Sequence, residues 1–160
     1  MSRRIFMTTT LAATGLGAFP TWATGFEVTH SSAEWKKLLS PAQYAILREE
    51  VTEKAFSNSL MGETSSLLKE ARKGTYHCAG CDLPVYSSET KFDSGTGWPS
   101  FYASLENAVG TKEDNTFFTK RTEVHCRRCG GHLGHIFNDG PKPTGKRHCL
   151  NGLAMTFTAA

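Results

Sequence analysis

Two Cys-x-x-Cys pairs, Cys78 with Cys81 and Cys126 with Cys129, constrain this chain more than any other feature of its sequence. The spacing lets two thiolates on one tight turn bind the same ion, and two such turns supply the four ligands of a tetrahedral zinc site. Because four protein ligands leave no open position, we expect a structural ion rather than a catalytic one. The pairs are far apart in the chain, so the ion should clamp two distant parts of the sheet together.

Other interpretations of these cysteines remain open. The pairs could form disulfides in an oxidising compartment, or His132 and His135 could replace two of the thiolates as ligands. We favour zinc held by four cysteines because disulfide frameworks rarely use matched pairs of this spacing. We also expect Gly80 and Gly130 to give the two turns the backbone freedom that they need.

The fifth cysteine, Cys149, stands outside the pairs and is the candidate reactive thiol. Arg147 places a fixed positive charge beside it, which favours the thiolate at neutral pH. One or both of His132 and His135 could donate a proton to a substrate oxygen. Asn151 could orient a group or donate a hydrogen bond near Cys149.

Two further residues fit this chemistry. Asp139 could hold a histidine or Arg147 in place, and Trp98, in a Gly-Trp-Pro turn, offers a flat apolar wall to a methyl-bearing substrate. Taken singly, each candidate has an ordinary structural explanation: a core tryptophan, a hydrogen-bonded histidine or an inert buried thiol. Their combination is what points to a site.

Hydrophobic periodicity and turn residues predict short helices followed by an antiparallel β domain. Ser31 with Glu34 is a capping-box pattern for a short helix through Leu39. Ser40 and Pro41 begin a second helix that we expect to run from residue 41 to about 54. Residues 56–66 are typical of a loop, and the expected strands are 75–78, 84–87, 116–119, 123–126, 133–137 and 153–158.

The first 23 residues are similar to a twin-arginine export signal. Arg3 and Arg4 precede an uncharged stretch over residues 8–19, and small residues at Thr21 and Ala23 fit a cleavage site. We therefore expect an exported, periplasmic protein with one domain over residues 24–160. An uncleaved flexible arm or a short anchor is the alternative.

Composition allows a globular core, with 39% hydrophobic and 21% charged residues among 160. The net charge is +3, and it becomes +1 if a cleaved leader takes Arg3 and Arg4 with it. This near-neutral balance removes the simplest electrostatic argument for nucleic acid or anionic lipid, so we expect neither as a stable partner.

With these motifs in order, the chain resembles the B-type methionine-(R)-sulfoxide reductases over residues 36–157. The resemblance rests on both cysteine pairs, the stretches 91–101 and 131–145, and the Arg147-x-Cys149-x-Asn151 cluster. It implies a mainly β fold of two antiparallel sheets, a β-tent, with short N-terminal helices and one zinc ion. It implies that Cys149 is the nucleophile and that His132 and His135 polarise or protonate the sulfoxide oxygen. Asp139, Arg147 and Asn151 would be supporting polar residues, and Trp98 and Phe137 would form the wall that contacts the substrate. The zinc ligands would be Cys78, Cys81, Cys126 and Cys129.

The resemblance also implies the reaction. A cysteine thiolate attacks the sulfoxide sulfur of an oxidised protein or peptide, methionine leaves, and the cysteine becomes a sulfenic acid that a thiol must reduce. Many family members carry a resolving cysteine where this chain has Thr96. We therefore expect a one-cysteine enzyme that an external thiol restores, either a thioredoxin-like protein or a small thiol. A cysteine of the pairs acting as resolver would disrupt the metal site.

His148 is a second departure, because Tyr or Phe is common at this position. It could tune Cys149 or simply fill the aromatic slot, and we favour the second because adjacent residues in a strand point to opposite faces. Two rival functions stay open. One is a zinc-knuckle module for nucleic acid, and the other is a Cys-His-Asn hydrolase, which would need no reductant.

Overall fold

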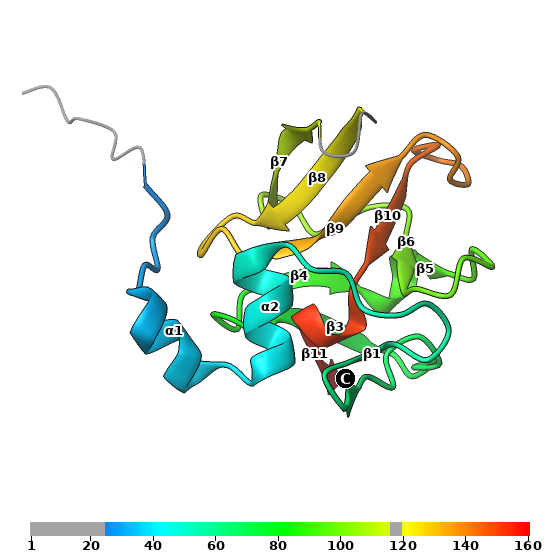
Figure 1. The fold of residues 1–160 in the computed structure, drawn as a ribbon. Coiled ribbons are helices and arrows are strands. Elements are labelled where there is room, and N and C mark those ends of the chain that lie inside the picture. The colour runs from blue at the N-terminus through cyan, green and yellow to red at the C-terminus, as the bar shows by residue number, and fades with distance from the viewer. Residues whose placement is uncertain (1–24, 116–119) are drawn as a thin grey trace, which may run out of the picture.

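The computed structural model describes residues 25–115 and 120–160, in which two short helices precede a series of antiparallel strands (Figure 1). The expected leader, residues 1–23, and the expected strand 116–119 lie outside the described residues. Within the described residues, no helix is both long and apolar enough to cross a bilayer.

Both helices begin at capping boxes, as predicted. Helix α1 (Ser32–Leu38) follows Ser31, whose side chain accepts from the Glu34 amide while the Glu34 carboxylate accepts from the Ser31 amide. Helix α2 (Pro41–Glu49) follows Ser40 in the same way. The predicted end near residue 54 is wrong, because Glu50 adopts a left-handed conformation (φ 59°) that terminates α2.

The strands form two main sheets and a small hairpin, and every strand pair is antiparallel. The largest sheet has the order β5-β6-β10-β9-β8-β7. Its strands are β5 (Lys91–Phe92), β6 (Ser100–Phe101), β7 (Val109–Asp114), β8 (Arg121–Cys126), β9 (His132–Phe137) and β10 (Arg147–Leu150). The second sheet is β11 (Met155–Ala159), β3 (Gly74–Cys78) and β4 (Pro84–Ser87), and the hairpin is β1 (Ser59–Leu60) with β2 (Glu63–Thr64).

The mainly β fold with short N-terminal helices is confirmed, and so are the strands expected at 75–78, 84–87, 123–126 and 133–137. The last expected strand begins two residues late, because Gly152–Ala154 form the 3₁₀ turn η3. The expected loop at 56–66 contains the small β1–β2 hairpin. Strands β5, β6, β7 and β10 escaped prediction because they are very short or too polar to alternate.

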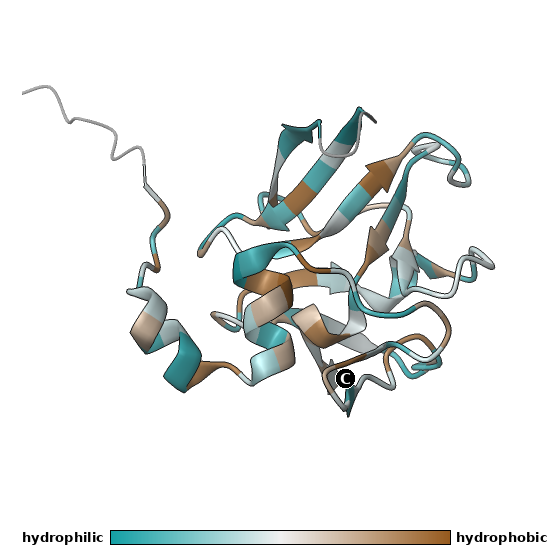
Figure 2. Cartoon of the chain, in the orientation of Figure 1, coloured by the Kyte–Doolittle hydropathy of each residue, from teal (hydrophilic) through white to brown (hydrophobic). Residues whose placement is uncertain are grey.

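The core lies between the two main sheets and under α2. Tyr76 of β3 and Tyr86 of β4 both pack against Phe101 of β6, with ring centroids 4.9 and 4.7 Å apart, and all three side chains are fully buried. On α2, Ile46 and Leu47 are buried, and polar and apolar segments alternate along β8 (Figure 2). One face of the six-stranded sheet thus packs into the core, and the other face is available to polar residues.

Candidate active site and metal centre

The four cysteines of the two pairs form one compact cluster, with all four sulfurs within 4.8 Å of one another. The Sγ atoms of Cys78 and Cys129 are 3.7 Å apart, and those of Cys81 and Cys126 are 3.5 Å apart. Tetrahedral zinc with Zn–S bonds of about 2.3 Å places its sulfurs about 3.8 Å apart, so the cluster fits the ion. A disulfide requires about 2.05 Å, and all five cysteines are free thiols.

The metal centre joins distant parts of the chain, as the spacing predicted, and the parts that it joins belong to two different sheets. Its first turn follows β3 and its second connects β8 to β9. We expected Gly80 to supply the unusual backbone conformation of the first turn, and this prediction is wrong. The left-handed residue after the first pair is Asp82 (φ 58°). Gly130 (φ 68°) holds the matching place after the second pair, as predicted. In both turns this residue donates its amide to the carbonyl of the pair's first cysteine.

A second group of polar residues forms a row across the six-stranded sheet. Cys149 on β10 lies directly opposite Ser100 on β6 and His135 on β9, and His135 lies opposite Glu123 on β8. Lys112 on β7 continues the row beyond Glu123. Directly paired residues of antiparallel strands share one face of the sheet. The register therefore places the thiol and a histidine side by side.

His132 joins this face through an irregularity of the sheet. Residues three apart in a regular strand point to opposite faces, yet the register shift beside Val124 turns His132 to the same side as His135. The two imidazole rings lie 5.3 Å apart, and Nδ1 of His132 is 3.0 Å from Oε1 of the buried Glu123. Gly134 is needed between them because a Cβ there would overlap the Cys149 carbonyl oxygen.

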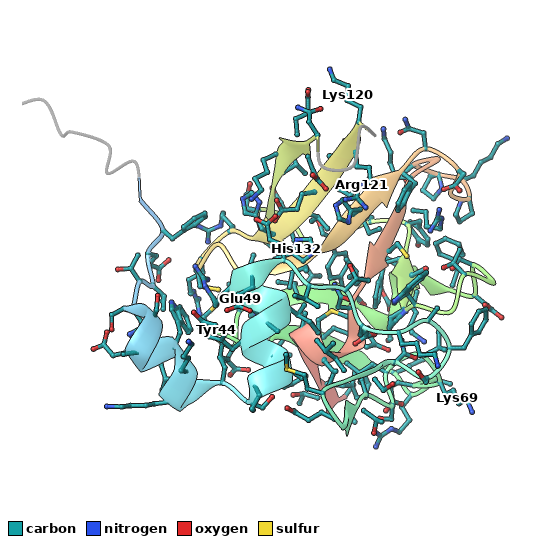
Figure 3. All side chains as sticks on the ribbon, viewed as in Figure 1. Tyr44, Glu49, Lys69, Lys120, Arg121 and His132 are labelled. Atoms are coloured by element: carbon teal, nitrogen blue, oxygen red, sulfur yellow. The ribbon has the colours of Figure 1, made fainter. Side chains whose placement is uncertain are left out.

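A parallel row of residues flanks the first. Asp114 on β7 pairs with Arg121 on β8 through a 2.7 Å ion pair, and the same carboxylate oxygen lies 2.8 Å from Nε2 of His135. Figure 3 shows Arg121 and His132 on this part of the sheet. Arg121, Asp114 and Glu123 were not among the residues predicted from the sequence. The alternation of charged residues at 121 and 123 along one strand is the signal that could have revealed two of them.

Arg147 and Asp139 interact with each other, which decides between the two partners expected for Asp139. Nε and Nη2 of Arg147 each donate to one carboxylate oxygen of Asp139 at 2.9 Å. The guanidinium also lies 4.4 Å from the centre of the Phe137 ring. Asp139 therefore positions Arg147 rather than a histidine.

Trp98 and Asn151 are fixed by the segment that follows α2. Nε1 of Trp98 donates to the Glu53 carbonyl, and the Glu53 amide donates to Oδ1 of Asn151. Nδ2 of Asn151 donates to the Leu133 carbonyl, so both ends of its amide are bonded to backbone. Asn151 acts here as a brace. Its hydrogen bonds orient the backbone near Cys149, one of the two roles expected for this residue.

These residues enclose a small cavity of about 130 Å³ with an apolar wall. Cys149, His135 and Arg121 line it together with Trp98, Phe137 and Asn151. A more polar cavity of about 420 Å³ adjoins it, shares Thr52, Arg121 and His135, and reaches His132. The sequence-predicted thiol, histidine and aromatic residues thus meet at one opening, while His132 lies behind it.

The sequence of this protein is similar to those of known proteins. A family model described as the SelR domain matches residues 39–159. The chain belongs to the SelR family. A peptide methionine sulfoxide reductase MsrB of Leptospira interrogans is 49% identical over 133 residues, which cover 82% of this chain and 96% of that protein. The MsrB of Methanosarcina barkeri is 50% identical over 131 residues, 81% of this chain and 87% of that protein.

Family membership confirms the resemblance and the expected enzyme class, an oxidoreductase acting on sulfur groups. It also agrees with the structural zinc that the cysteine cluster fits. Among solved structures, the Mis18 'Yippee-like' domain matches at a TM-score of 0.46 and 15% identity, over 56% of this chain and 98% of that one.

The ionisation of the site residues follows from their burial. Burial raises the pKa of Cys149, although Thr96, Arg147 and Ser100 oppose it. Arg147 favours the thiolate, as expected, but desolvation has the larger influence on the pKa of Cys149. Burial also lowers the pKa of His135, against its bond to Asp114, and lowers that of His132 to about 4. In this SelR-family site, the resting pair at neutral pH is a thiol beside a neutral histidine.

His148 fills the aromatic slot, which confirms the favoured interpretation. Its side chain is buried on the face opposite Cys149, and its Nδ1 lies 2.9 Å from the Tyr86 hydroxyl. Its ring meets that of Tyr86 edge-on at 5.6 Å. It does not tune the thiol by direct contact.

Proposed function

We propose that this protein reduces methionine sulfoxide in oxidised proteins or peptides to methionine, with Cys149 as the nucleophile. The observation that carries the proposal is the cross-strand pairing of Cys149 with His135 at the mouth of an apolar cavity. The names of the family relatives support the same substrate. Trp98 and Phe137 provide the apolar contact that a methyl-thioether group requires.

The sulfoxide-reduction step neither takes up nor releases a proton. Sulfur of Cys149 attacks the sulfoxide sulfur, the S–O bond breaks, and the oxygen is transferred to give methionine and a cysteine sulfenic acid. The proton that Cys149 loses equals the one that the departing oxygen gains. His135 is placed to move that proton, since it faces both the thiol and the cavity. His132, enclosed behind it, positions His135.

We further propose that the enzyme acts on the R epimer. Family membership supports this choice, and the asymmetric lining of the cavity would enforce it. Arg147, held by Asp139, lies beside Cys149 and favours the thiolate that forms during attack. Asn151 and Glu53 keep Trp98 in place on the other side.

Thr96 supports a cycle with one cysteine. Its Oγ1 lies 3.7 Å from Sγ of Cys149, so the position of the family's usual resolving cysteine is in contact with the nucleophile. A hydroxyl cannot form a disulfide, and the other four cysteines belong to the metal cluster. An external thiol would then attack the sulfenic acid, releasing water and forming a mixed disulfide, and a second thiol would restore Cys149. A thioredoxin-like protein or a small thiol could supply both.

An assay with the two separate sulfoxide epimers of a methionine-containing peptide tests the proposal. With dithiothreitol as reductant, we expect methionine from the R epimer only and none with Cys149→Ser. Turnover of the S epimer alone, or of neither, would overturn it. Hydrolysis of an ester without dithiothreitol would favour the hydrolase, and binding of RNA or DNA at low salt would favour the nucleic-acid module.

We also propose export to the periplasm with the mature chain beginning near residue 24, on the sequence pattern of the leader alone. Replacement of both Arg3 and Arg4 by lysine should retain the protein in the cytoplasm. Unchanged export, measured by fractionation and N-terminal sequencing, would contradict a twin-arginine route.

A further inference from the structure

Three hydroxyl groups lie beside Cys149, and the reaction as described uses none of them. Oγ of Ser94 is 2.8 Å from Oγ1 of Thr96 and 2.7 Å from Oγ of Ser100. At one end Thr96 reaches the Cys149 sulfur, and at the other Ser100 donates to the Trp98 carbonyl at 3.1 Å. The three hydroxyl groups therefore form a continuous hydrogen-bond chain from the Cys149 sulfur to the Trp98 carbonyl.

The backbone holds this chain in place from two sides. Ser100 lies directly opposite Cys149 in the β6–β10 pair, so its side chain points to the same face. The loop before it turns at Gly95 (φ 69°) and Gly97 (φ 88°), and the Asp93 carboxylate accepts the Gly95 amide. This turn brings Thr96 back to the sulfur. A Cβ at Gly97 would collide with Phe56.

The row of hydroxyl groups can form a complete set of hydrogen bonds whether the Cys149 thiol is protonated or ionised. With Cys149 protonated, S–H donates to Thr96, Thr96 to Ser94, Ser94 to Ser100, and Ser100 to the carbonyl. With Cys149 ionised, each hydroxyl can rotate, so that Ser100 donates to Ser94, Ser94 to Thr96, and Thr96 to the sulfur. Consecutive hydrogen bonds in such a chain polarise and strengthen one another in a poorly solvated site.

We propose that Thr96 is a catalytic residue, which donates a hydrogen bond to the Cys149 thiolate as it forms, and that Ser94 orients this donor. The residue that replaces the resolving cysteine thus acts in the attack rather than in resolution. The inference deepens the proposed function and rests on it for its biological meaning. A buried thiolate needs such donors, because desolvation is the largest influence on the pKa of Cys149.

Charged and titratable groups from the neighbouring strands also face the thiol and must be held constant in a test. They are Arg147 on its own strand, His135 on β9 and Arg121 on β8, while β6 contributes the uncharged Ser100. Changes at Thr96 and Ser94 leave the two arginines and His135 in place.

The test is the pH dependence of Cys149 alkylation by iodoacetamide in the zinc-loaded protein, with the modified residue identified by mass spectrometry. We expect Thr96→Val, which keeps the shape of the side chain, to move the profile about one pH unit higher. Thr96→Ser should restore the original profile. Ser94→Ala, which does not touch the sulfur, should shift it less and in the same direction.

An unchanged profile for Thr96→Val, with normal zinc content and unfolding midpoint, would overturn the proposal. If that variant does not fold, Ser94→Ala decides the question by the same criterion. The experiment contains no sulfoxide, so it can succeed or fail independently of the reductase activity.

Discussion

At the scale of single residues, the site combines two groups whose ionisations burial moves apart. Burial raises the pKa of the Cys149 thiol and lowers the pKa of His135. In the proposed mechanism the reactive form, a thiolate with an imidazolium, contains as many protons as the resting form, a thiol with a neutral histidine. Its fraction is therefore constant between the two pKa values.

The single-turnover rate of sulfoxide reduction should consequently be flat from below the usual histidine range to above the usual range of a cysteine thiol. His135→Asn should lose about 10²- to 10⁴-fold in this rate and abolish its fall in acid. Rapid-quench measurement of methionine across the pH range checks both. A sharp optimum near neutrality in the wild type would contradict this assignment.

His148 makes a prediction about stability rather than activity. Its pKa is lowered to about 4 by burial, so the unfolded chain binds a proton more readily than the folded one. Its contribution is complete above the unfolded pKa, near 6.5, and is lost as pH falls toward 4. At pH 5 the loss is about 2 kcal/mol of unfolding free energy.

His148→Phe should remove that loss, at a pH-independent cost of about 1–3 kcal/mol for the unpaired Tyr86 hydroxyl. Urea unfolding at pH 7.5 and pH 5 measures the difference, which should be smaller in the variant. An equal pH dependence in both proteins would show that His148 is not buried neutral.

At the scale of elements, short tertiary connections fix what the sequence pattern leaves open. Glu53 lies in the segment expected to be helix, and it is almost fully buried. Its carboxylate accepts from the Asn58 side chain and from the amides of Gly152 and Leu153, which begin η3. Its backbone holds Trp98 and Asn151. One residue thus connects the end of α2, the 3₁₀ turn and Trp98.

Glu53→Gln should lower the unfolding free energy by about 2 kcal/mol, because an amide cannot accept all three bonds. It should also change the fluorescence of Trp98. The exposed Glu106→Gln is the matched control and should stay within about 0.5 kcal/mol of wild type. Equal stabilities for the two variants would remove the assigned role of Glu53.

The sequence predicted most reliably what local chemistry determines. Capping boxes at Ser31 and Ser40 and the paired cysteines act over a few residues, and all were confirmed. The extension of α2 past Glu50 was wrong because tertiary bonds to Glu53 override helix propensity. The pairing of Cys149 with His135, and the position of His132, depend on strand register and a register shift that no local pattern encodes.

At the scale of the whole molecule, the metal cluster connects the two main sheets between which the core lies. Removal of zinc should therefore destabilise the entire chain while leaving the chemistry of Cys149 intact in any folded remainder. A loss of about 4 kcal/mol would lower the melting temperature by roughly 10–15 °C in a chain of this size.

Thermal unfolding before and after chelation, with zinc measured in parallel, checks this expectation. Cys126→Ser should behave like the chelated protein, whereas Cys149→Ser should keep both its zinc and its melting temperature. Zinc loss without a change in melting temperature would contradict a structural role for the ion.

If Cys149 alone performs the redox chemistry, a single turnover without reductant should oxidise this cysteine and no other. The reduced, zinc-loaded protein is mixed with excess methionine-(R)-sulfoxide peptide, a sulfenic acid probe is added, and each cysteine is mapped by mass spectrometry. We predict one methionine formed per chain and one oxygen atom trapped on Cys149, with the four metal ligands unchanged. An intramolecular disulfide between Cys149 and a cysteine of the metal cluster, or methionine formed with Cys149 unmodified, would show that Cys149 does not act alone.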